Sequence, residues 1–289
     1  MTTAPASEGF VPFRGYRTFY EAVGDFAQKP AGMFPLLALH GRPPSHEALE
    51  PLKGLVDAGR PVIFYDQLGC GRSDRPDDPS LWSISLFVDE LDAVRRELKL
   101  EQVHLLGHSW GGVVALEYAL RQPGGIVSLI LSSTYVSRAM LDADFERLRG
   151  ELPADVQETL RSHEAAGTME DPAYEQASRV FDLRHVCRVD PWPEYFDRAA
   201  KRRPVGRVNM EGWDIRARLK ETGVPTLVTC GRFDFCTPAQ AELIHKGIPG
   251  SELVIFEHSS HYAHVEETNR YLAVLHGFMT RTEQQAREV

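Results

Sequence analysis

The chain has 289 residues, which is long for one domain and short for two, so one core with a single inserted segment fits best. A hydrophobic content of 43% and a charged content of 25% are those of an ordinary globular protein, and no apolar run approaches the ~20 residues of a membrane span. The net charge of −9, offset only by a short basic run at 201–203, argues against nucleic-acid backbone binding, which depends on clustered lysine and arginine.

The cysteines and the start of the chain indicate a cellular setting. Cys70, Cys187, Cys230 and Cys236 form no CxxC pair and are few for this length, so we expect reduced, mostly buried thiols in a cytoplasmic protein. The first residues, MTTAPASEGFVPF, have neither the basic start nor the apolar stretch of a secretory signal.

Short apolar runs predict the strands of a sheet. Two strand-like pieces lie around 15–24, and continuous apolar runs follow at 34–41, 61–69, 102–107, 126–133, 224–231 and 252–257. Runs of this length are typical of strands buried on both faces of a parallel sheet. The segment 85–100 has a helical pattern, with Phe87, Leu91, Val94 and Leu98 on one face. Alternation of strands and helices predicts an α/β fold with right-handed crossovers.

One interval breaks this alternation. Between about 135 and 212 no buried-strand pattern occurs, and prolines punctuate several short helical segments. The interval is too long for a loop and too small for an independent domain. We therefore expect a core formed by 1–134 and 213–289, with 135–212 inserted into it as a helical cap.

The sequence Gly107-His108-Ser109-Trp110-Gly111 matches the pattern G-x-S-x-G directly after a predicted strand and directly before a helical pattern. In that context the pattern predicts a nucleophile elbow, a tight corner that holds a serine hydroxyl clear of the sheet. Glycines on both sides let neighbouring backbone pass close by. A chance match in an ordinary turn is the alternative, although it does not require a strand and a helix on either side.

A serine nucleophile needs a base and an orienting carboxylate, which follow it in this architecture in the order acid, then histidine. Asp234 follows the predicted strand 224–231, and His261 follows the strand 252–257. We assign Asp234 as the orienting acid and His261 as the general base. His258 and His264 are the other histidines to consider for this role. The alternatives are that they are structural residues or, together with His261, metal ligands. The three span a strand end, a loop and a helix start and need not converge, so no metal and no other cofactor is expected.

An acyl-transfer site also needs hydrogen-bond donors for the oxyanion. The backbone N–H of Trp110, directly after the nucleophile, is one candidate. The other is the backbone N–H of Arg42, in the loop after the strand 34–41, where the neighbouring prolines 43 and 44 have no N–H to donate. An ordinary strand-to-helix turn is the alternative for this loop.

Several stretches resemble the α/β-hydrolase superfamily and, more narrowly, its proline iminopeptidase group. They are YDQLGCGRSDRP (65–76), LLGHSWGGVVALEYAL (105–120), DPWPE (190–194), WDI (213–215), PTLVTCGRFDFCTP (225–238) and ELVIFEHSSHYAHVEE (252–267). The resemblance implies an α/β-hydrolase fold, with a mostly parallel eight-stranded sheet flanked by helices and an inserted helical cap. It also implies the same Ser109, Asp234 and His261 assignment, and cleavage just after an N-terminal residue, often proline, or of small amino-acid amides.

The chain departs from the group's usual pattern in three places. Arg42 replaces the second glycine of the loop HGGPG, and Phe235 replaces a glutamate that often follows the triad aspartate. The last stretch of the cap, at 205–212, is shorter than in the group. The missing glutamate bears on the substrate, because in the group such residues hold the substrate amine.

An aminopeptidase must hold an ammonium group in a partly desolvated pocket, where an unpaired cation is costly, so we expect carboxylates there. Glu194, Asp190 and Glu211 of the cap are the candidates, with solvated surface acids as the alternative reading. Phe235, Trp192 and Trp110 would instead line an apolar pocket. The predicted substrate-binding residues are Gly41, Trp192, Glu194, Glu211 and Phe235.

Three functions remain open at this point. The first is a serine hydrolase of small amides or short peptides, acting through an acyl-enzyme on Ser109. The second is an esterase, lactonase, thioesterase or acyl transferase on a neutral small molecule, with a remodelled cap. The third is a non-catalytic binding protein, which has no need of Ser109, Asp234 and His261 together. In each case the expected partner is a small molecule or short peptide, not a nucleic acid or a membrane, and the sequence does not indicate the oligomeric state.

Overall fold

The computed structural model describes residues 6–26, 30–42, 44–201, 205–206 and 208–288. Eight strands form one sheet in the order β1-β2-β4-β3-β5-β6-β7-β8. Neighbours from β4 to β8 pair in parallel, whereas β2 runs antiparallel to β1 and to β4. The strands are β1 (Ala6–Phe13), β2 (Tyr16–Val23), β3 (Leu36–Leu39), β4 (Val62–Tyr65), β5 (Val103–His108), β6 (Ile126–Ser132), β7 (Thr226–Gly231) and β8 (Glu252–Phe256).

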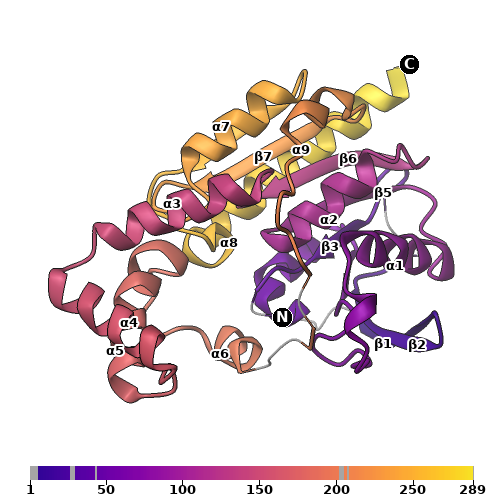
Figure 1. The fold of residues 1–289 in the computed structure, drawn as a ribbon. Coiled ribbons are helices and arrows are strands. Elements are labelled where there is room, and N and C mark those ends of the chain that lie inside the picture. Colours follow the sequence, from indigo (N-terminus) through magenta and orange to yellow (C-terminus); the bar gives the residue numbers. More distant parts are fainter. Residues whose placement is uncertain (1–5, 27–29, 43, 202–204, 207, 289) are drawn as a thin grey trace.

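Helices connect the strands and cover both faces of the sheet (Figure 1). In chain order the core has η1 (His46–Ala58), η2 (Pro79–Leu81), α1 (Ile84–Glu97), α2 (Trp110–Ala119), η4 (Arg216–Glu221), α7 (Pro238–Gly247), α8 (Ala263–Glu266) and α9 (Thr268–Glu288). Between β6 and η4 lie α3 (Arg138–Gly150), α4 (Ala154–Ala166), α5 (Pro172–Phe181), the π-helical turn η3 (Asp182–Val186) and α6 (Glu194–Ala200). The predicted α/β class and the eight-stranded, mostly parallel sheet are therefore confirmed.

Each continuous apolar run supplies buried side chains to both faces of the sheet. Leu37 and Leu39 of β3 belong to a buried cluster that also contains residues of α1, α2 and α7, whereas Leu36 and Ala38 belong to a second cluster with residues of η1 and α9. All four residues of this strand are fully buried. Because side chains alternate along a strand, a run without polar interruption leaves no face for solvent, which is why helices cover both sides.

The two ends of the sheet differ from the sequence prediction. The first strand lies at Ala6–Phe13, before the predicted interval, and joins β2 through a turn in which Arg14 and Gly15 both have positive φ. The prediction missed it because most of β1 faces solvent and its apolar run, Phe10–Phe13, is short and contains a proline. The run 252–257 was predicted as buried on both faces, but β8 is an edge strand and its middle residues are only partly buried.

The helices α3 to α6 occupy the predicted cap interval, and α4, α5 and α6 gather beyond one end of the sheet (Figure 1). The chain leaves and re-enters the core at neighbouring points: Ser137 and Asp214 form an isolated antiparallel bridge. The N–H of Ile215 also donates to the carbonyl of Val136 at 2.9 Å. This paired exit and return supports our proposal that 135–212 is a cap inserted between the two halves of the core.

All four cysteines are free, and Cys187, Cys230 and Cys236 are buried. Within the described ranges, no helix combines the length and apolar character that crossing a bilayer would take.

A buried charge pair ties η1 to the segment after β4. The carboxylate of Asp66 accepts hydrogen bonds from the backbone N–H and the ring Nδ1 of His46, at 2.7 and 2.8 Å. Nε2 of His46 lies 3.4 Å from Glu21. Burial by itself lowers the pKa of His46, but the hydrogen bonds to Asp66 and Glu21 outweigh burial and raise this pKa to about 9. Burial by itself raises the pKa of Asp66, but the hydrogen bond and the charge of His46 outweigh burial and lower this pKa.

This pair predicts a pH-dependent stability. A histidine with a raised pKa in the folded state contributes fully below its unfolded pKa of 6.5, and the contribution disappears as pH rises through about 9. Asp66 has a lowered pKa, so its contribution is present above its unfolded pKa of 3.8 and is lost only in acid. We expect His46→Gln to lower the free energy of unfolding at pH 6 more than at pH 9.5. The difference between the two losses should be roughly 3 kcal/mol. Urea unfolding of both proteins at the two pH values measures this, and a pH-independent difference would contradict it.

Candidate active site

Ser109 occupies the corner between β5 and α2 with φ of +54° and ψ of −118°. Residues other than glycine rarely adopt positive φ, and holding one there costs on the order of 1–3 kcal/mol. Backbone contacts maintain it: the Ser109 N–H donates to the carbonyl of Ser132 at 2.9 Å, and Thr134 Oγ1 donates to the carbonyl of Ser109 at 2.8 Å. The predicted strained corner is confirmed, and the Ser109 side chain faces a large cavity.

The corner is tight enough to require glycine on both sides. A Cβ at Gly107 would lie 2.3 Å from the carbonyl oxygen of Gly111, and a Cβ at Gly111 would lie 2.3 Å from the carbonyl oxygen of Leu39. A Cβ at Gly41, in the loop after β3, would lie 2.6 Å from the Cβ of Ser109. The loop after β3 therefore packs directly against the serine, as an oxyanion loop requires.

Asp234 and His261 meet at the carboxyl end of the sheet. Nδ1 of His261 lies 2.7 Å from Oδ1 of Asp234, and both side chains are buried. The same Asp234 oxygen accepts a hydrogen bond from the backbone N–H of Cys236 at 2.7 Å. A carboxylate on Nδ1 places the ring proton there and leaves Nε2 as the basic nitrogen. His261 and Ser109 line the same cavity.

Two neighbours restrict the His261 ring and its loop. The ring of Phe235 lies against that of His261, with centroids 4.1 Å apart and an interplanar angle of 30°. Nε2 of His108 lies 2.9 Å from the carbonyl oxygen of His261. Burial lowers the pKa of His108 well below its usual value, so its ring is neutral and donates from this nitrogen. The role of His108 could not be predicted from the sequence, because its contact joins segments 153 positions apart.

The candidate oxyanion residues border the same cavity. Gly41 is buried, Arg42 is exposed, and both line the cavity together with Trp110. As the first residue of α2, Trp110 has a backbone N–H with no acceptor in its own helix, and the positive end of the helix dipole lies there.

The cavity has a volume of about 1080 Å³ and lies between the cap and the carboxyl ends of the strands. Apolar side chains of the cap cover much of it, and three carboxylates line it: Asp142, Glu164 and Asp182. Arg138 neutralises Asp142 at 2.6 Å, and Arg149 neutralises Glu164 at 2.9 Å.

Asp182 differs from the other two acids. It begins the π-helical turn η3, and no described residue forms an ion pair or a side-chain hydrogen bond with its carboxylate. The nearby Arg179 is engaged elsewhere, by Asp190 at 2.8 Å and over the ring of Trp192 at 4.2 Å. Burial raises the pKa of Asp182 to about 6, and the charge of Arg179 only partly opposes this. A desolvated, unpaired carboxylate in a cavity attracts a cationic group.

The predicted substrate-binding residues separate into two sets. Gly41, Trp192 and Phe235 line the cavity. Glu194 and Glu211 do not: the Glu194 side chain is 90% exposed and pairs with Arg198, and Glu211 is exposed as well. Asp190 is also outside the lining. The prediction of these acids was wrong, because the pattern of the sequence did not show which cap acids face inward.

The three histidines near the end of β8 do not converge on a metal. His258 is exposed, whereas Nε2 of the buried His264 lies 3.0 Å from the carbonyl oxygen of Ala48. The described group that comes nearest to a metal-ligand set is Asp234, Cys236 and His261, with ligand atoms within 4.8 Å of one another. Burial raises the pKa of the Cys236 thiol well above its usual value, and Asp234 already binds His261, so this donor set does not fit a metal ion.

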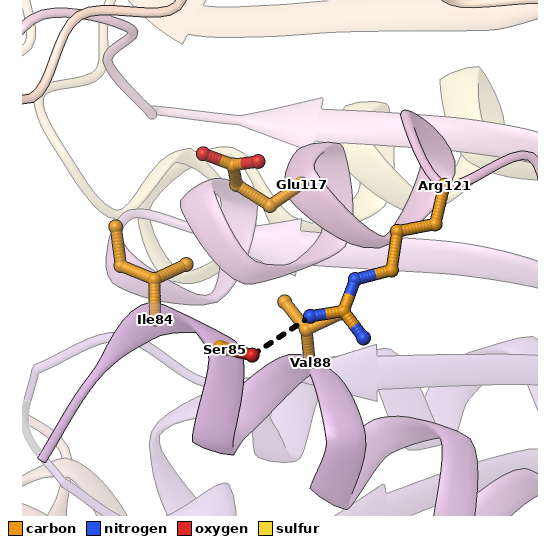
Figure 2. Close-up of a pocket in the computed structure, with 5 residues that line it drawn as sticks. All are labelled: Ile84, Ser85, Val88, Glu117 and Arg121. Carbon is orange, nitrogen blue, oxygen red and sulfur yellow. Dashed lines mark hydrogen bonds between the residues drawn. The ribbon is translucent and has the colours of Figure 1, made fainter.

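A smaller hollow of about 230 Å³ lies between α1 and α2 (Figure 2). Arg121 crosses it and donates to Ser85 at 3.1 Å and to Asp89 at 2.6 Å. Its polar groups are already paired, and none of the predicted site residues lines it. The large cavity is therefore the candidate active site.

Comparison with known proteins agrees with this geometry. Residues 35–268 match the family model described as the alpha/beta hydrolase fold, and the chain belongs to the α/β hydrolases. It is 37% identical to a proline iminopeptidase of Heyndrickxia coagulans, over 94% of this chain and 98% of the relative. Within the α/β hydrolases the chain belongs to the family of these proline iminopeptidases.

Two solved structures share the whole fold. The crystal structure of VinJ superposes with a TM-score of 0.89 at 34% identity, covering 96% of this chain and 99% of VinJ. The proline iminopeptidase of Mycobacterium smegmatis gives a TM-score of 0.87 at 33% identity, covering 97% of this chain and 100% of that chain.

The packing of the elbow leads to a prediction about stability. We expect Gly111→Ala to lower the free energy of unfolding by about 1–3 kcal/mol, because its Cβ would be forced against the backbone of Leu39. Gly124→Ala is the matched control, since a Cβ there meets no atom within 4 Å. Urea unfolding of both variants measures the difference, and equal stability of the two would contradict the packing described here.

Proposed function

We propose that Ser109, His261 and Asp234 act as nucleophile, general base and orienting acid of an acyl-transfer reaction. Nε2 of His261 takes the hydroxyl proton of Ser109 as the serine oxygen attacks the substrate carbonyl carbon. Donors from Trp110 and the loop after β3 stabilise the negative oxygen that forms. The shared cavity, the Asp234–His261 contact and the position of Ser109 support these roles.

The proposed reaction has two halves. In the first, His261 returns the proton to the leaving amine nitrogen as the carbon–nitrogen bond breaks, which leaves an acyl-enzyme on Ser109. In the second, water attacks the acyl carbon and gives a proton to His261. The proton then passes to the Ser109 oxygen as the acid is released. All groups needed are protein side chains and backbone, so the mechanism uses no cofactor.

We further propose that the substrate is a peptide or amide with a free N-terminal amine, and that the enzyme is an aminopeptidase of the proline iminopeptidase type. The single observation that carries this proposal is the Asp182 carboxylate, which no described residue pairs, in the cavity that Ser109 lines. A carboxylate there binds the ammonium group and places the first residue's carbonyl group next to Ser109. The names of the relatives support the same substrate class, and the free cysteines agree with a cytoplasmic setting.

A neutral ester or lactone is the second candidate substrate. Phe235 favours it, because this aromatic ring lies on His261 at the position where the group often has an amine-binding glutamate. The two candidates share the chemistry at Ser109 and differ in whether the substrate carries an amine.

For the nucleophile we predict that Ser109→Ala abolishes turnover of prolyl-p-nitroanilide and of p-nitrophenyl esters while the protein stays folded. The change removes only a hydroxyl group that faces the cavity and leaves the backbone contacts of residue 109 in place. Chromogenic assays and circular dichroism measure the two properties. Activity that survives in the purified variant would refute the assignment.

For the amine site we predict that Asp182→Asn lowers kcat/KM for prolyl-p-nitroanilide by about 10- to 100-fold, because a charge-assisted contact with the ammonium group is lost. Asp182→Glu should retain more of the activity, and hydrolysis of p-nitrophenyl acetate should change little. Glu194→Gln is the matched control, since its exposed side chain lies outside the cavity.

The pH dependence of amine binding provides a further check on Asp182. The carboxyl group is neutral below its pKa, so the affinity of Ser109→Ala protein for prolinamide should fall as pH drops below about 6. The dependence should weaken when Asp182→Asn is added. If Asp182→Asn leaves peptide hydrolysis and prolinamide binding unchanged while esters turn over, the neutral substrate is favoured instead.

A further inference from the structure

Gln67 is a fully buried amide that the proposed chemistry does not use. It lies two positions after the end of β4 and is 1% exposed. Its side-chain amide makes two hydrogen bonds, one as a donor and one as an acceptor. Nε2 donates to the carbonyl oxygen of His40 at 2.7 Å, and Oε1 accepts from the indole Nε1 of Trp110 at 2.8 Å.

The first bond reaches the loop that packs against the nucleophile. His40 directly precedes Gly41, whose Cα lies so close to Ser109 that a Cβ would clash with it. The backbone N–H of Gln67 also donates to Nε2 of His40 at 3.1 Å. Gln67 therefore holds both the main chain and the ring of His40.

These contacts assign the proton of the His40 ring. Burial lowers the pKa of His40, so the ring is neutral, and Nε2 accepts from Gln67. The single ring proton must then lie on Nδ1, which donates to the carbonyl oxygen of Gly41 at 2.9 Å. The orientation of the Gly41 peptide thus depends, through His40, on Gln67.

The second bond reaches the other side of the proposed oxyanion hole. Trp110 follows the nucleophile, and its backbone N–H is one of the two candidate donors. A hydrogen bond on its indole nitrogen restrains the side chain of the residue whose main chain must point at the oxyanion. One amide group therefore connects the elbow after β5 with the loop after β3.

We propose that Gln67 is a positioning residue that holds the two sides of the oxyanion hole at a fixed separation. The inference rests on the proposed acyl-transfer function but not on the substrate amine. A negative oxygen gains most from donors that are already in place, since moving them during the reaction costs energy. Loss of Gln67 should therefore weaken binding of the transition state more than binding of the substrate.

The test compares the wild-type protein with Gln67→Met, which keeps the length of the side chain and the backbone N–H bond to His40 but removes both side-chain hydrogen bonds. We expect kcat to fall by about 10- to 100-fold and KM to change by less than about threefold. Trp110→Phe removes only the indole donor, and we expect the double variant to lose less than the product of the two single losses. A boronic acid that forms a tetrahedral adduct with Ser109 should lose affinity in parallel with kcat, whereas affinity for the product amino acid should stay constant.

Gln240→Met is the matched control. Gln240 is also 1% exposed, and its amide donates to Asp144 at 2.7 Å, away from the elbow and from the loop after β3. A merely structural role for Gln67 would lower the stability or the active fraction of both variants, without a selective loss of kcat per active site.

Labelling by a fluorophosphonate tests the proposed function separately from the role of Gln67, because labelling needs Ser109 and the oxyanion hole but no particular substrate. No labelling of wild-type Ser109 would refute the proposed function. Two results would overturn the role of Gln67 and leave the proposed function standing. One is efficient labelling of the wild type with an equal rate for Gln67→Met. The other is that Gln67→Met loses affinity for the boronic acid and for the product equally.

Discussion

The backbone of Ser109 is held in a conformation that amino acids with a Cβ rarely adopt, and the architecture around the site accommodates it. The corner brings β5, α2 and the loop after β3 so close together that Gly41, Gly107 and Gly111 have no room for a side chain. Main-chain and hydroxyl contacts to Ser132 and Thr134 hold the serine in place. The parallel sheet supplies those contacts because neighbouring strands end at the same edge.

The core and the cap supply different parts of the site. Strand ends of the core carry Ser109, Asp234 and His261, and buried neighbours such as His108 and Gln67 hold the loops that bear them or lie beside them. The cap supplies most of the cavity wall and its three acids. Arg138 and Arg149 neutralise two of these acids, so among the described residues the charge of the cavity depends on Asp182. Recognition could change by substitution in the cap without disturbing the chemistry below.

Much of the fold followed from the sequence because continuous apolar runs and a glycine-flanked serine are local signals. They placed six parallel strands, the strained corner, and the positions of Asp234 and His261 at the same edge of the sheet. The first strand was missed because most of it faces solvent and its apolar run is only four residues long. The sequence pointed to Glu194 and Glu211 and not to Asp182, because burial and the pairing of neighbouring arginines are tertiary properties. The same limit hid Gln67 and His108, whose contacts join distant segments.

We propose that Ser109 attacks the carbonyl group of a substrate that is held by its amine. The most direct measurement uses a diphenyl phosphonate analogue of proline, which phosphonylates an activated serine, followed by peptide mapping by mass spectrometry. We expect one adduct, on Ser109, that forms much faster from the reagent with a free amine than from its N-acetylated counterpart. An adduct on another residue, or equal rates for the two reagents, would contradict it.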